Sequence, residues 1–292
     1  MTFFNRRYQE TLEKKLISNY KVNHCSFEFF PPKNILEEEK LWTSISKLST
    51  LKPTFFSVTY GANSGERKKT YNIVKKIYKN TGIVSVPHMT CVDASPIELQ
   101  KIAEKYWCSG LKSILALRGD APHKNYIHDM YAVDLVKLLK KIADFDISVA
   151  AYPEVHPESK NYILDIINLK KKVDAGANRA ITQFFFNIDS YLRFRDNCVQ
   201  HGINIEIIPG ILPISNFQQL QRFSALTNVK IPSWIFHMFD CLEKDFMTQE
   251  VIGSVIAVEM VKKLLGEGVK NFHFYTLNKH KVVYSICYML GL

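Results

Sequence analysis

Short apolar segments alternate with longer amphipathic segments along the chain. The apolar segments are rich in β-branched and aromatic residues, and such runs favour strands. The predicted strands are 26–30, 54–60, 84–89, 113–118, 147–152, 180–185, 205–209 and 271–276.

The amphipathic segments repeat their apolar residues every three or four positions, which predicts helices. The helices predicted between the strands are 34–50, 65–80, 95–108, 130–143, 160–175, 188–201, 215–228 and 248–265. An extra N-terminal helix is predicted at 3–20, and another at about 233–245, starting at Pro232-Ser233.

Most of the predicted strands are apolar on both faces, as in 147–151 and 205–208. Burial on both faces is typical of parallel strands covered by helices. Eight such strands, each followed by a helix or a helical tail, predict an α/β fold, a closed (β/α)8 TIM barrel. An open doubly wound sheet is the alternative. No repeat or linker divides 1–292, so we expect a single domain.

Polar side chains gather where the predicted strands end. Seven of the eight ends carry them: Glu28, Thr59, Tyr60, His88, Arg118, Asp120, Tyr152, Glu154, His156, Gln183, Thr276, Asn278 and Lys279. In a barrel, the C-terminal strand ends share one rim, where the active sites of this fold are built. The N-terminal strand ends show no matching set, so this rim is the predicted site.

Glu28 stands within an aromatic run, Phe27-Glu28-Phe29-Phe30, which Pro31-Pro32 ends. One interpretation is an exposed glutamate at a strand end, since glutamate is mostly exposed in proteins. The other is a carboxyl group in an apolar pocket, with a raised pKa, that serves as a general acid. The aromatic neighbours alone do not decide between them.

Composition places the chain among ordinary globular proteins, with 292 residues, 47% hydrophobic and 23% charged. No apolar run approaches the roughly 20 residues that span a bilayer, and the N-terminus shows no signal peptide. The six cysteines are irregularly spaced without CxxC, which indicates reduced thiols in a cytoplasmic protein. The expected partners therefore include no membrane.

The net charge of +10 raises the question of a nucleic-acid surface. The lysines are dispersed, and no stripe interleaves basic and aromatic residues as single-strand binders do. Lysines on solvated helix faces are the favoured interpretation, so no nucleic-acid partner is expected. A positive field would still attract phosphates and carboxylates.

Two loops carry candidate ligand contacts. In Arg118-Gly119-Asp120, the guanidinium suits a phosphate or carboxylate, and the glycine allows close backbone approach; an Arg–Asp pair that braces a turn is the alternative. In 150–158, Tyr152 suits stacking on a flat ring, and His156 suits a phosphate or ribose. A metal site at Glu154 and His156 lacks companion ligands and is disfavoured, so no metal is predicted.

Other candidates are less specific. His88 and the lysines 170–172 have ordinary structural interpretations as well as ligand-binding ones. Gln183 lies among aromatics and suits the edge of a heterocycle, and Gln219 and Phe223 share a helix face. GxGxxG and Walker loops are absent, so a dinucleotide would bind without a Rossmann fingerprint.

Together these segments resemble methylenetetrahydrofolate reductases of the short bacterial type. The matching stretches are 27–33, 56–62, 87–90, 117–120, 151–157, 181–186, 208–214 and 272–278, in the order of the family. Each is weak alone, but eight in order are highly specific.

The resemblance implies a catalytic (β/α)8 barrel over 1–292 that binds FAD. It implies that NADH, or NADPH, reduces the flavin and leaves, and that the flavin then reduces 5,10-methylenetetrahydrofolate to 5-methyltetrahydrofolate for methionine biosynthesis. It also implies an enzyme, an oxidoreductase that prefers NADH, and a homo-oligomer, with tetramers among relatives. The regulatory domain of long members is not expected within this length.

By the same resemblance, Glu28 is the expected general acid and Asp120 the group that tunes the flavin and stabilises a folate cation. The residues expected at FAD are Thr59, Tyr60, His88, Arg118, Gly119, Asp120, Tyr131, Ala132, Ala150, Tyr152, His156, Asp165, Asn168, Lys171 and Lys172. Those expected at the substrate are Gln183, Gln219, Phe223 and Lys279. Lys171 and Lys279 stand where arginine is common, which keeps the charge but loses the bidentate fork.

Two other functions remain as alternatives. Another barrel flavoenzyme, such as proline dehydrogenase, would share the fold and cofactor but not explain the Glu28 stretch together with Arg118-Gly119-Asp120. A basic nucleic-acid-binding protein would show steeply salt-dependent binding.

Overall fold

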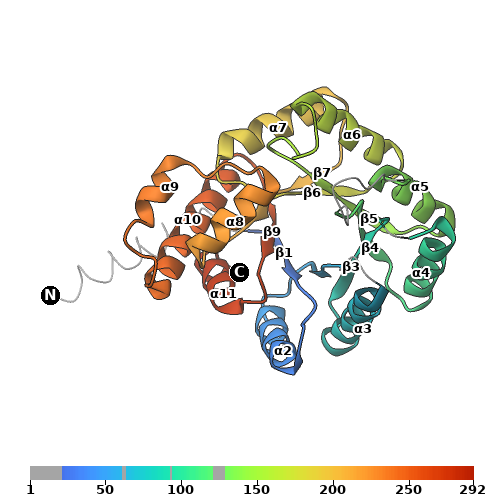
Figure 1. Ribbon diagram of the computed structural model, residues 1–292, viewed down its shortest axis with the longest axis horizontal. Helices are drawn as coiled ribbons and strands as arrows, with labels where there is room; N and C mark the ends of the chain where they lie inside the picture. Colours follow the sequence, from blue (N-terminus) through green and yellow to red (C-terminus); the bar gives the residue numbers. More distant parts are fainter. Residues whose placement is uncertain (1–21, 61–63, 93, 121–128) are drawn as a thin grey trace, which may run out of the picture.

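The structure is a computed structural model that describes residues 22–60, 64–92, 94–120 and 129–292. The helix predicted at 3–20 lies outside the described residues. Within them, the strands form one parallel sheet wrapped into a ring with helices outside it (Figure 1). The strands are β1 His24–Phe29, β2 Phe55–Val58, β3 Val84–Thr90, β4 Ser113–Leu117, β5 Asp146–Ala151, β6 Arg179–Thr182, β7 Glu206–Ile208, β8 Gly210–Ile211 and β9 Asn271–Tyr275.

The ring closes through a broken strand. The order of neighbours is β7-β6-β5-β4-β3-β2-β1-β9-β8, and β7 and β8 are consecutive segments separated by Pro209. β7 pairs with β6 on one side, while β8 pairs with β9 on the other. Proline has no N–H to continue a ladder, but the Pro209 carbonyl accepts a 3.0 Å bond from His273 N. The predicted seventh strand therefore joins both ends of the sheet, and the closed barrel is confirmed.

Helices alternate with these strands as predicted. They are α2 Ile35–Ser49, α3 Ser64–Thr81, α4 Pro96–Cys108, α5 Ala132–Ile142, α6 Tyr162–Asp174, α7 Ile188–Gln200, α8 Phe217–Thr227, α9 Ser233–Met238, α10 Phe246–Gly266 and α11 His280–Met289. The helix predicted at 233–245 is wrong beyond Met238. The chain turns there, with Cys241 at φ 61°, and Asp245 then caps α10. None of the described helices is long and apolar enough to cross a membrane.

Alternation along the strands divides the apolar residues into two cores. Phe27, Phe29 and Phe56 belong to the large core between the sheet and the helices. A smaller cluster of Phe55, Val86, Leu115, Ile181 and Ile208 comes from strands alone and fills the barrel interior. Successive strand side chains point to opposite faces, so Glu28, between Phe27 and Phe29, points into the barrel.

The N-terminal end of the barrel is also polar, so the expectation of no matching set there is wrong. Arg179 holds Asp146 through two bonds of 2.8 Å, from Nη1 and Nη2, and Ser113 Oγ donates to Asp146 at 3.1 Å. Asn271 donates to Glu206 at the same end. These groups are paired with one another, apart from Asn271 Oδ1, which is buried without a partner among the described residues. What distinguishes the opposite rim is the cavity that its polar groups line.

Replacing Gly253 with alanine is expected to destabilise the protein. An added Cβ would lie 1.8 Å from Ile214 O, a backbone atom, because α10 packs directly on the chain that follows β8. Overpacking against backbone costs about 1–3 kcal/mol or more. Gly266→Ala, at the other end of the same helix, has nothing within 4 Å and is the matched control. Thermal unfolding by circular dichroism should show a lower Tm for Gly253→Ala alone; equal Tm values would contradict this packing.

Candidate active site

Glu28 lies at the C-terminal end of β1 with its side chain only 13% exposed. Two imidazoles contact the same carboxyl oxygen, Oε2: His88 Nε2 from β3 at 3.3 Å and His273 Nε2 from β9 at 3.5 Å. His88 is 8% and His273 1% exposed. The exposed strand-end interpretation of Glu28 is therefore wrong, because the carboxyl group is enclosed by the barrel.

The other interpretation of Glu28, a carboxyl group with a raised pKa, does not fit this structure either. Burial raises the pKa, but the charge of His88 and the hydrogen bond with His273 outweigh it and lower the pKa to about 2. The aromatic neighbours that suggested an apolar pocket, Phe27 and Phe29, point into the outer core instead. At neutral pH the carboxyl group is ionised, and its environment is one of imidazoles.

His273 is held in place by three neighbours. Its Nδ1 lies 2.7 Å from Ser26 Oγ, and Ser26 Oγ also lies 3.4 Å from Phe272 O. The ring stacks on Phe55, with centroids 5.7 Å apart, and meets Tyr275 edge-on at 5.4 Å. Tyr275 in turn donates to Thr182 O at 2.7 Å, across the barrel. These contacts fix the His273 ring inside the barrel, next to the Glu28 carboxyl group.

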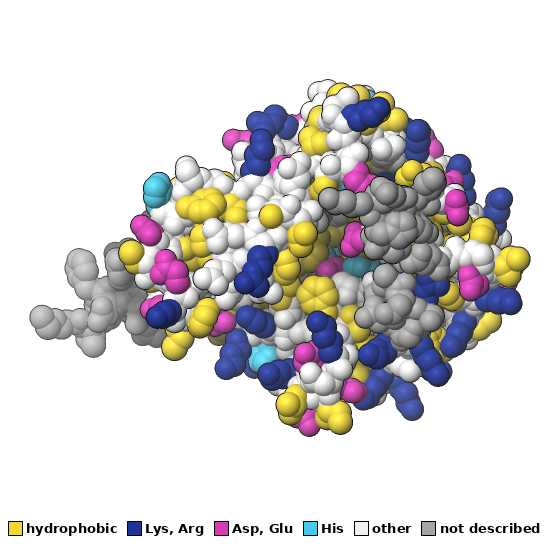
Figure 2. Space-filling view, in the orientation of Figure 1, with side chains coloured by type: hydrophobic (Ala, Val, Ile, Leu, Met, Phe, Trp, Pro, Cys, Tyr) yellow, Lys and Arg dark blue, Asp and Glu magenta, His cyan; other side chains and the backbone are white. Residues whose placement is uncertain are grey.

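A cavity of two parts lies at the C-terminal rim, and Glu28, His88 and His273 line neither part. One part, of about 520 Å³, runs between the ends of β4 and β5 and the starts of α5 and α6. A second part, of about 220 Å³, reaches Tyr60 and Thr90, and the two share Leu117, Arg118, Tyr152 and His156. Figure 2 shows this face hollowed over the barrel, with basic side chains spread around its outer part.

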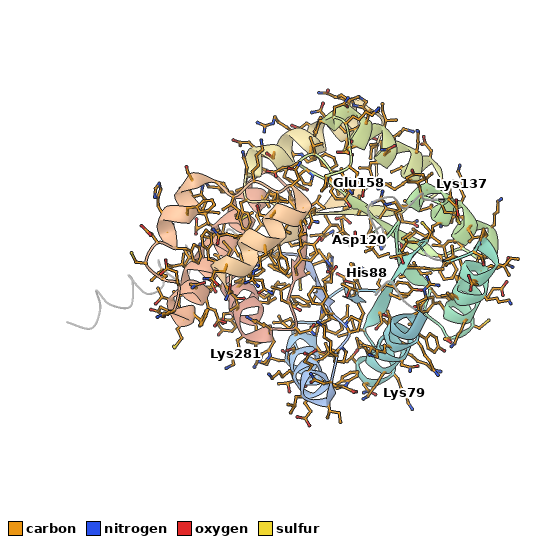
Figure 3. All side chains as sticks on the ribbon, viewed as in Figure 1. Lys79, His88, Asp120, Lys137, Glu158 and Lys281 are labelled. Carbon is orange, nitrogen blue, oxygen red and sulfur yellow. The ribbon has the colours of Figure 1, made fainter. Side chains whose placement is uncertain are left out.

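Most residues expected at FAD line this cavity. Those that do are Tyr60, Arg118, Gly119, Asp120, Tyr131, Ala132, Ala150, Tyr152, His156, Asp165, Asn168, Lys171 and Lys172. Thr59 and His88 line neither part, and His88 contacts Glu28 instead. In Figure 3, His88, Asp120 and Glu158 lie toward the open centre of the ring, whereas Lys79, Lys137 and Lys281 lie on outer helices.

Two cationic side chains of the cavity, Arg118 and Lys172, donate to different acceptors. The Arg118 guanidinium donates to the Glu158 carboxylate from both Nη atoms, and the bond from Nη2 is 2.7 Å long. Its carboxylate partner is therefore Glu158, and not Asp120 as in the alternative of an Arg–Asp pair. Lys172 Nζ donates to Ala150 O at 2.6 Å. Burial lowers the pKa of Lys172 to about 8, against the attraction of Asp165. A buried ammonium group beside a carbonyl is suited to receive an anion.

Several polar atoms at this rim are buried without a hydrogen-bond partner among the described residues. They are Ser57 Oγ, Tyr60 Oη, His88 Nε2 and Thr90 Oγ1. Burial also raises the pKa of the Tyr152 phenol to about 12. Unpaired buried polar atoms are uncommon and call for an explanation such as a ligand. Two of these four residues, Tyr60 and Thr90, line the smaller part of the cavity.

Gly119 also has a structural role. Its φ is 90°, and a Cβ there would lie 2.5 Å from Val92 Cγ1 and 3.0 Å from Thr90 Cβ. The space beside the glycine is therefore filled by the protein. Gly119 lets the loop after β4 turn tightly over β3, which places Arg118 and Asp120 at the cavity.

Three of the four residues expected at the substrate lie at one small groove. Gln219 and Phe223 line one small groove with Leu212, Ser215 and Leu277. Lys279 Nζ donates to Ser215 Oγ at 3.2 Å, which brings it to the same groove. Gln183 follows β6, and its Oε1 accepts from Phe184 N at 3.0 Å.

Within the described part of the chain, no group of three or more metal-ligating side chains is arranged around a common point. Glu154 accepts from Lys230 N at 2.7 Å, and His156 Nδ1 accepts from Glu158 N at 3.1 Å. Both side chains therefore hold loops together.

Sequence reasoning missed Ser26, His273, Tyr275 and Glu158. The first three share the inward face with Glu28, since Ser26 is level with His273 and Glu28 with Tyr275 in the β1–β9 pairing. Counting every second residue along the two strands would have found them. The partnership of Arg118 with Glu158, 40 residues later, leaves no local signal in the sequence.

Comparison with known proteins identifies the family of the chain. The model of the family Methylenetetrahydrofolate reductase matches residues 13–291. The chain is 66% identical to the 5,10-methylenetetrahydrofolate reductase of Buchnera aphidicola subsp. Schizaphis graminum, over 100% of both chains. It is 56% identical to that of Escherichia coli strain K12, over 100% of this chain and 99% of the relative.

Among solved structures, a protein from Clostridium thermocellum that binds two copies of 5-methyl-5,6,7,8-tetrahydrofolic acid has the same fold. Its TM-score is 0.64 at 15% identity, with 95% of this chain and 97% of that chain covered. That likeness shows the barrel alone. The family match and the two full-length relatives go further: the chain belongs to the methylenetetrahydrofolate reductase family of oxidoreductases.

Proposed function

We propose that this protein is a flavin-dependent methylenetetrahydrofolate reductase, which uses a nicotinamide nucleotide to make 5-methyltetrahydrofolate. The observation that carries the proposal is a buried carboxyl group, Glu28, at the same rim of the barrel as a cavity whose lining combines cations, aromatic rings and small residues. Preference for NADH, supply of methionine biosynthesis and assembly into a homo-oligomer are further predictions from the family resemblance.

FAD fits the cavity on chemical grounds. Lys172, Lys171 and Arg118 would meet the diphosphate, helped by the first backbone N–H groups of α5 at Ala132. Ala150 and Ala151 leave a flat wall for a ring, and Tyr152 lies between the two parts of the cavity. The unpaired hydroxyl groups of Tyr60 and Thr90 would bond to the ring edge. Bound FAD would carry a hydride from the nucleotide to the folate.

Arg118 is already arranged to hold an anion. The guanidinium forms an ion pair with Glu158, whose side chain is 55% exposed. Ion pairs with an exposed partner contribute little to stability, about 0–1 kcal/mol. A phosphate could therefore replace the Glu158 carboxylate at small cost, and the guanidinium would keep its orientation.

The chain supplies a proton and electrostatic stabilisation. The folate ring must open before it can accept a hydride, and opening needs a proton on N10. In this proposal Glu28 delivers that proton. Asp120, at the cavity edge, would stabilise the cation that ring opening produces. Gln183 would bind the pterin, while Gln219, Phe223 and Lys279 would position the rest of the folate.

Substitution of Glu28 should slow one half-reaction and leave the other nearly unchanged. Glu28→Gln removes the acidic proton and keeps the shape, so the oxidation of the reduced protein by methylenetetrahydrofolate should slow by about 10²–10⁴-fold. Reduction of the bound flavin by NADH needs no such proton and should change little. Stopped-flow absorbance of the flavin measures both rates. If both rates fell together, the general-acid role would be wrong.

Lys172 should control the affinity for FAD. Lys172→Met removes a charge-assisted contact, worth about 1.5–3 kcal/mol, so FAD affinity should fall by about 10–100-fold. The matched control is Lys170→Met, since Lys170 pairs with Asp174 and lines neither part of the cavity. Equilibrium fluorescence titration of the apoprotein with FAD measures both.

The same titration tests a pH dependence. The Lys172 pKa is lowered to about 8, so its ammonium group is charged below that pH and neutral above it. FAD affinity should therefore decrease as pH rises through about 8 to 10, and Lys172→Met should flatten this decrease. A protein that takes up no FAD at any pH would overturn the proposed function.

A further inference from the structure

We propose that His273, oriented by Ser26, stores the proton that Glu28 delivers to the substrate, so that Ser26, His273 and Glu28 act as one proton-donating unit. The inference rests on the proposed function, in which Glu28 protonates N10. It starts from a conflict: a general acid must carry a proton, yet Glu28 is ionised beside its two imidazoles. The proton therefore has to be held close by.

The contacts identify where it is held. His273 Nε2 faces Glu28 Oε2 at 3.5 Å, and the opposite nitrogen, Nδ1, lies 2.7 Å from Ser26 Oγ. The Ser26 hydroxyl reaches Phe272 O at 3.4 Å as a donor. When it donates there, its oxygen accepts from Nδ1–H, and Nδ1 keeps its proton. Nε2 is then the nitrogen that gains and loses a proton, and it points at Glu28.

His88 does not offer the same arrangement. Its Nε2 is also near Oε2, at 3.3 Å, but it makes no hydrogen bond of good geometry within the described residues. No neighbour there fixes its ring as Ser26, Phe55 and Tyr275 fix that of His273. A base oriented by a third group is the arrangement that enzymes use for controlled proton transfer. This favours His273 as the store.

Other titratable groups around the unit are few. Among the described residues, those facing Glu28 are His88 from β3 and His273 and Tyr275 from β9. The neighbour level with Glu28 on β2 is Ser57, which does not titrate in this range. The Tyr275 pKa is raised well above its usual value by burial and by Glu28, so the phenol keeps its proton. The mobile proton is therefore shared between imidazole and carboxylate.

The proton balance closes over one turnover. The Nε2–H bond of the His273 imidazolium breaks, and its proton passes to the Glu28 carboxylate. The resulting acid gives the proton to N10 of the folate, whose bond to the bridging carbon breaks. The electron pair of N10 forms the new N–H bond. A proton from solvent then restores the imidazolium, which matches the one proton that the reduction consumes.

His273→Gln should change the pH profile of the folate half-reaction. With the store removed, Glu28 must take its proton from solvent, so the rate should fall tenfold per pH unit across pH 6–8. At pH 7.5 it should be about 10²-fold below the wild-type rate. Reduction of the flavin by NADH should stay within about threefold. The wild-type rate should not show this tenfold slope over the same range.

His280→Gln is the matched control. His280 Nδ1 lies 3.1 Å from Ser44 Oγ, so this is a second Ser–His pair, and no described carboxylate contacts it. Its variant should keep the wild-type profile. His88→Gln should lower the rate without producing the tenfold slope. A wild-type profile in His273→Gln, or the slope appearing only in His88→Gln, would overturn the proposal.

A direct measurement needs neither flavin nor folate. In protein labelled with 15N-histidine, the Nε2 and Nδ1 shifts of His273, assigned with His273→Gln, report its protonation. Glu28→Gln removes the carboxylate and should lower the His273 titration midpoint by about one pH unit or more. An unchanged midpoint would overturn the stored proton and leave the proposed function standing.

Ser26→Ala provides a second test of the proposal if the His273→Gln variant does not fold. It keeps both the imidazole and the carboxylate but removes the acceptor for Nδ1–H. We expect about a tenfold slower folate half-reaction, a shifted His273 midpoint and unchanged flavin reduction by NADH. Ser26→Thr retains the hydroxyl and should restore the rate. If Ser26→Ala matched the wild type in both rate and midpoint, Ser26 would have no part in the unit.

Discussion

The site depends on one costly arrangement, an ionised carboxylate held inside a barrel. Removing a carboxylate from water costs several kcal/mol unless partners compensate for it. Here the compensation comes from strands that are far apart in the sequence, since β3 supplies His88 and β9 supplies His273. β9 pairs directly with β1, and β3 lies on the other side of β1 with only β2 between them. The pairing of the first strand with the last strand is therefore what completes the site.

The sequence predicted the framework well because the relevant signals are local. Strand and helix periodicity follows from short-range patterns, and the parallel barrel follows from their alternation. The extra helix was overextended because the left-handed turn at Cys241 is not visible in composition. The break at Pro209 was visible, but the two different partners of its flanking segments were not.

The structure brings most of the residues expected at FAD to one cavity, but the sequence did not predict the chemistry around Glu28. The environment of Glu28 was misjudged, since adjacent phenylalanines in a strand point away from it and the groups that do face it come from other strands. Sequence neighbours are thus poor guides to the pKa of a strand residue, whereas inward-facing neighbours on paired strands are good ones.

The broken strand at Pro209 has one more consequence, for motion. β8 offers its partner β9 only two residues, Gly210 and Ile211, whereas β1 pairs with β9 over five. The ring therefore has a seam where few backbone hydrogen bonds must open for the wall to yield. The groove of Gln219 and Phe223 follows directly after that seam. Local opening of the barrel wall should therefore concentrate between β8 and β9 rather than between β1 and β9.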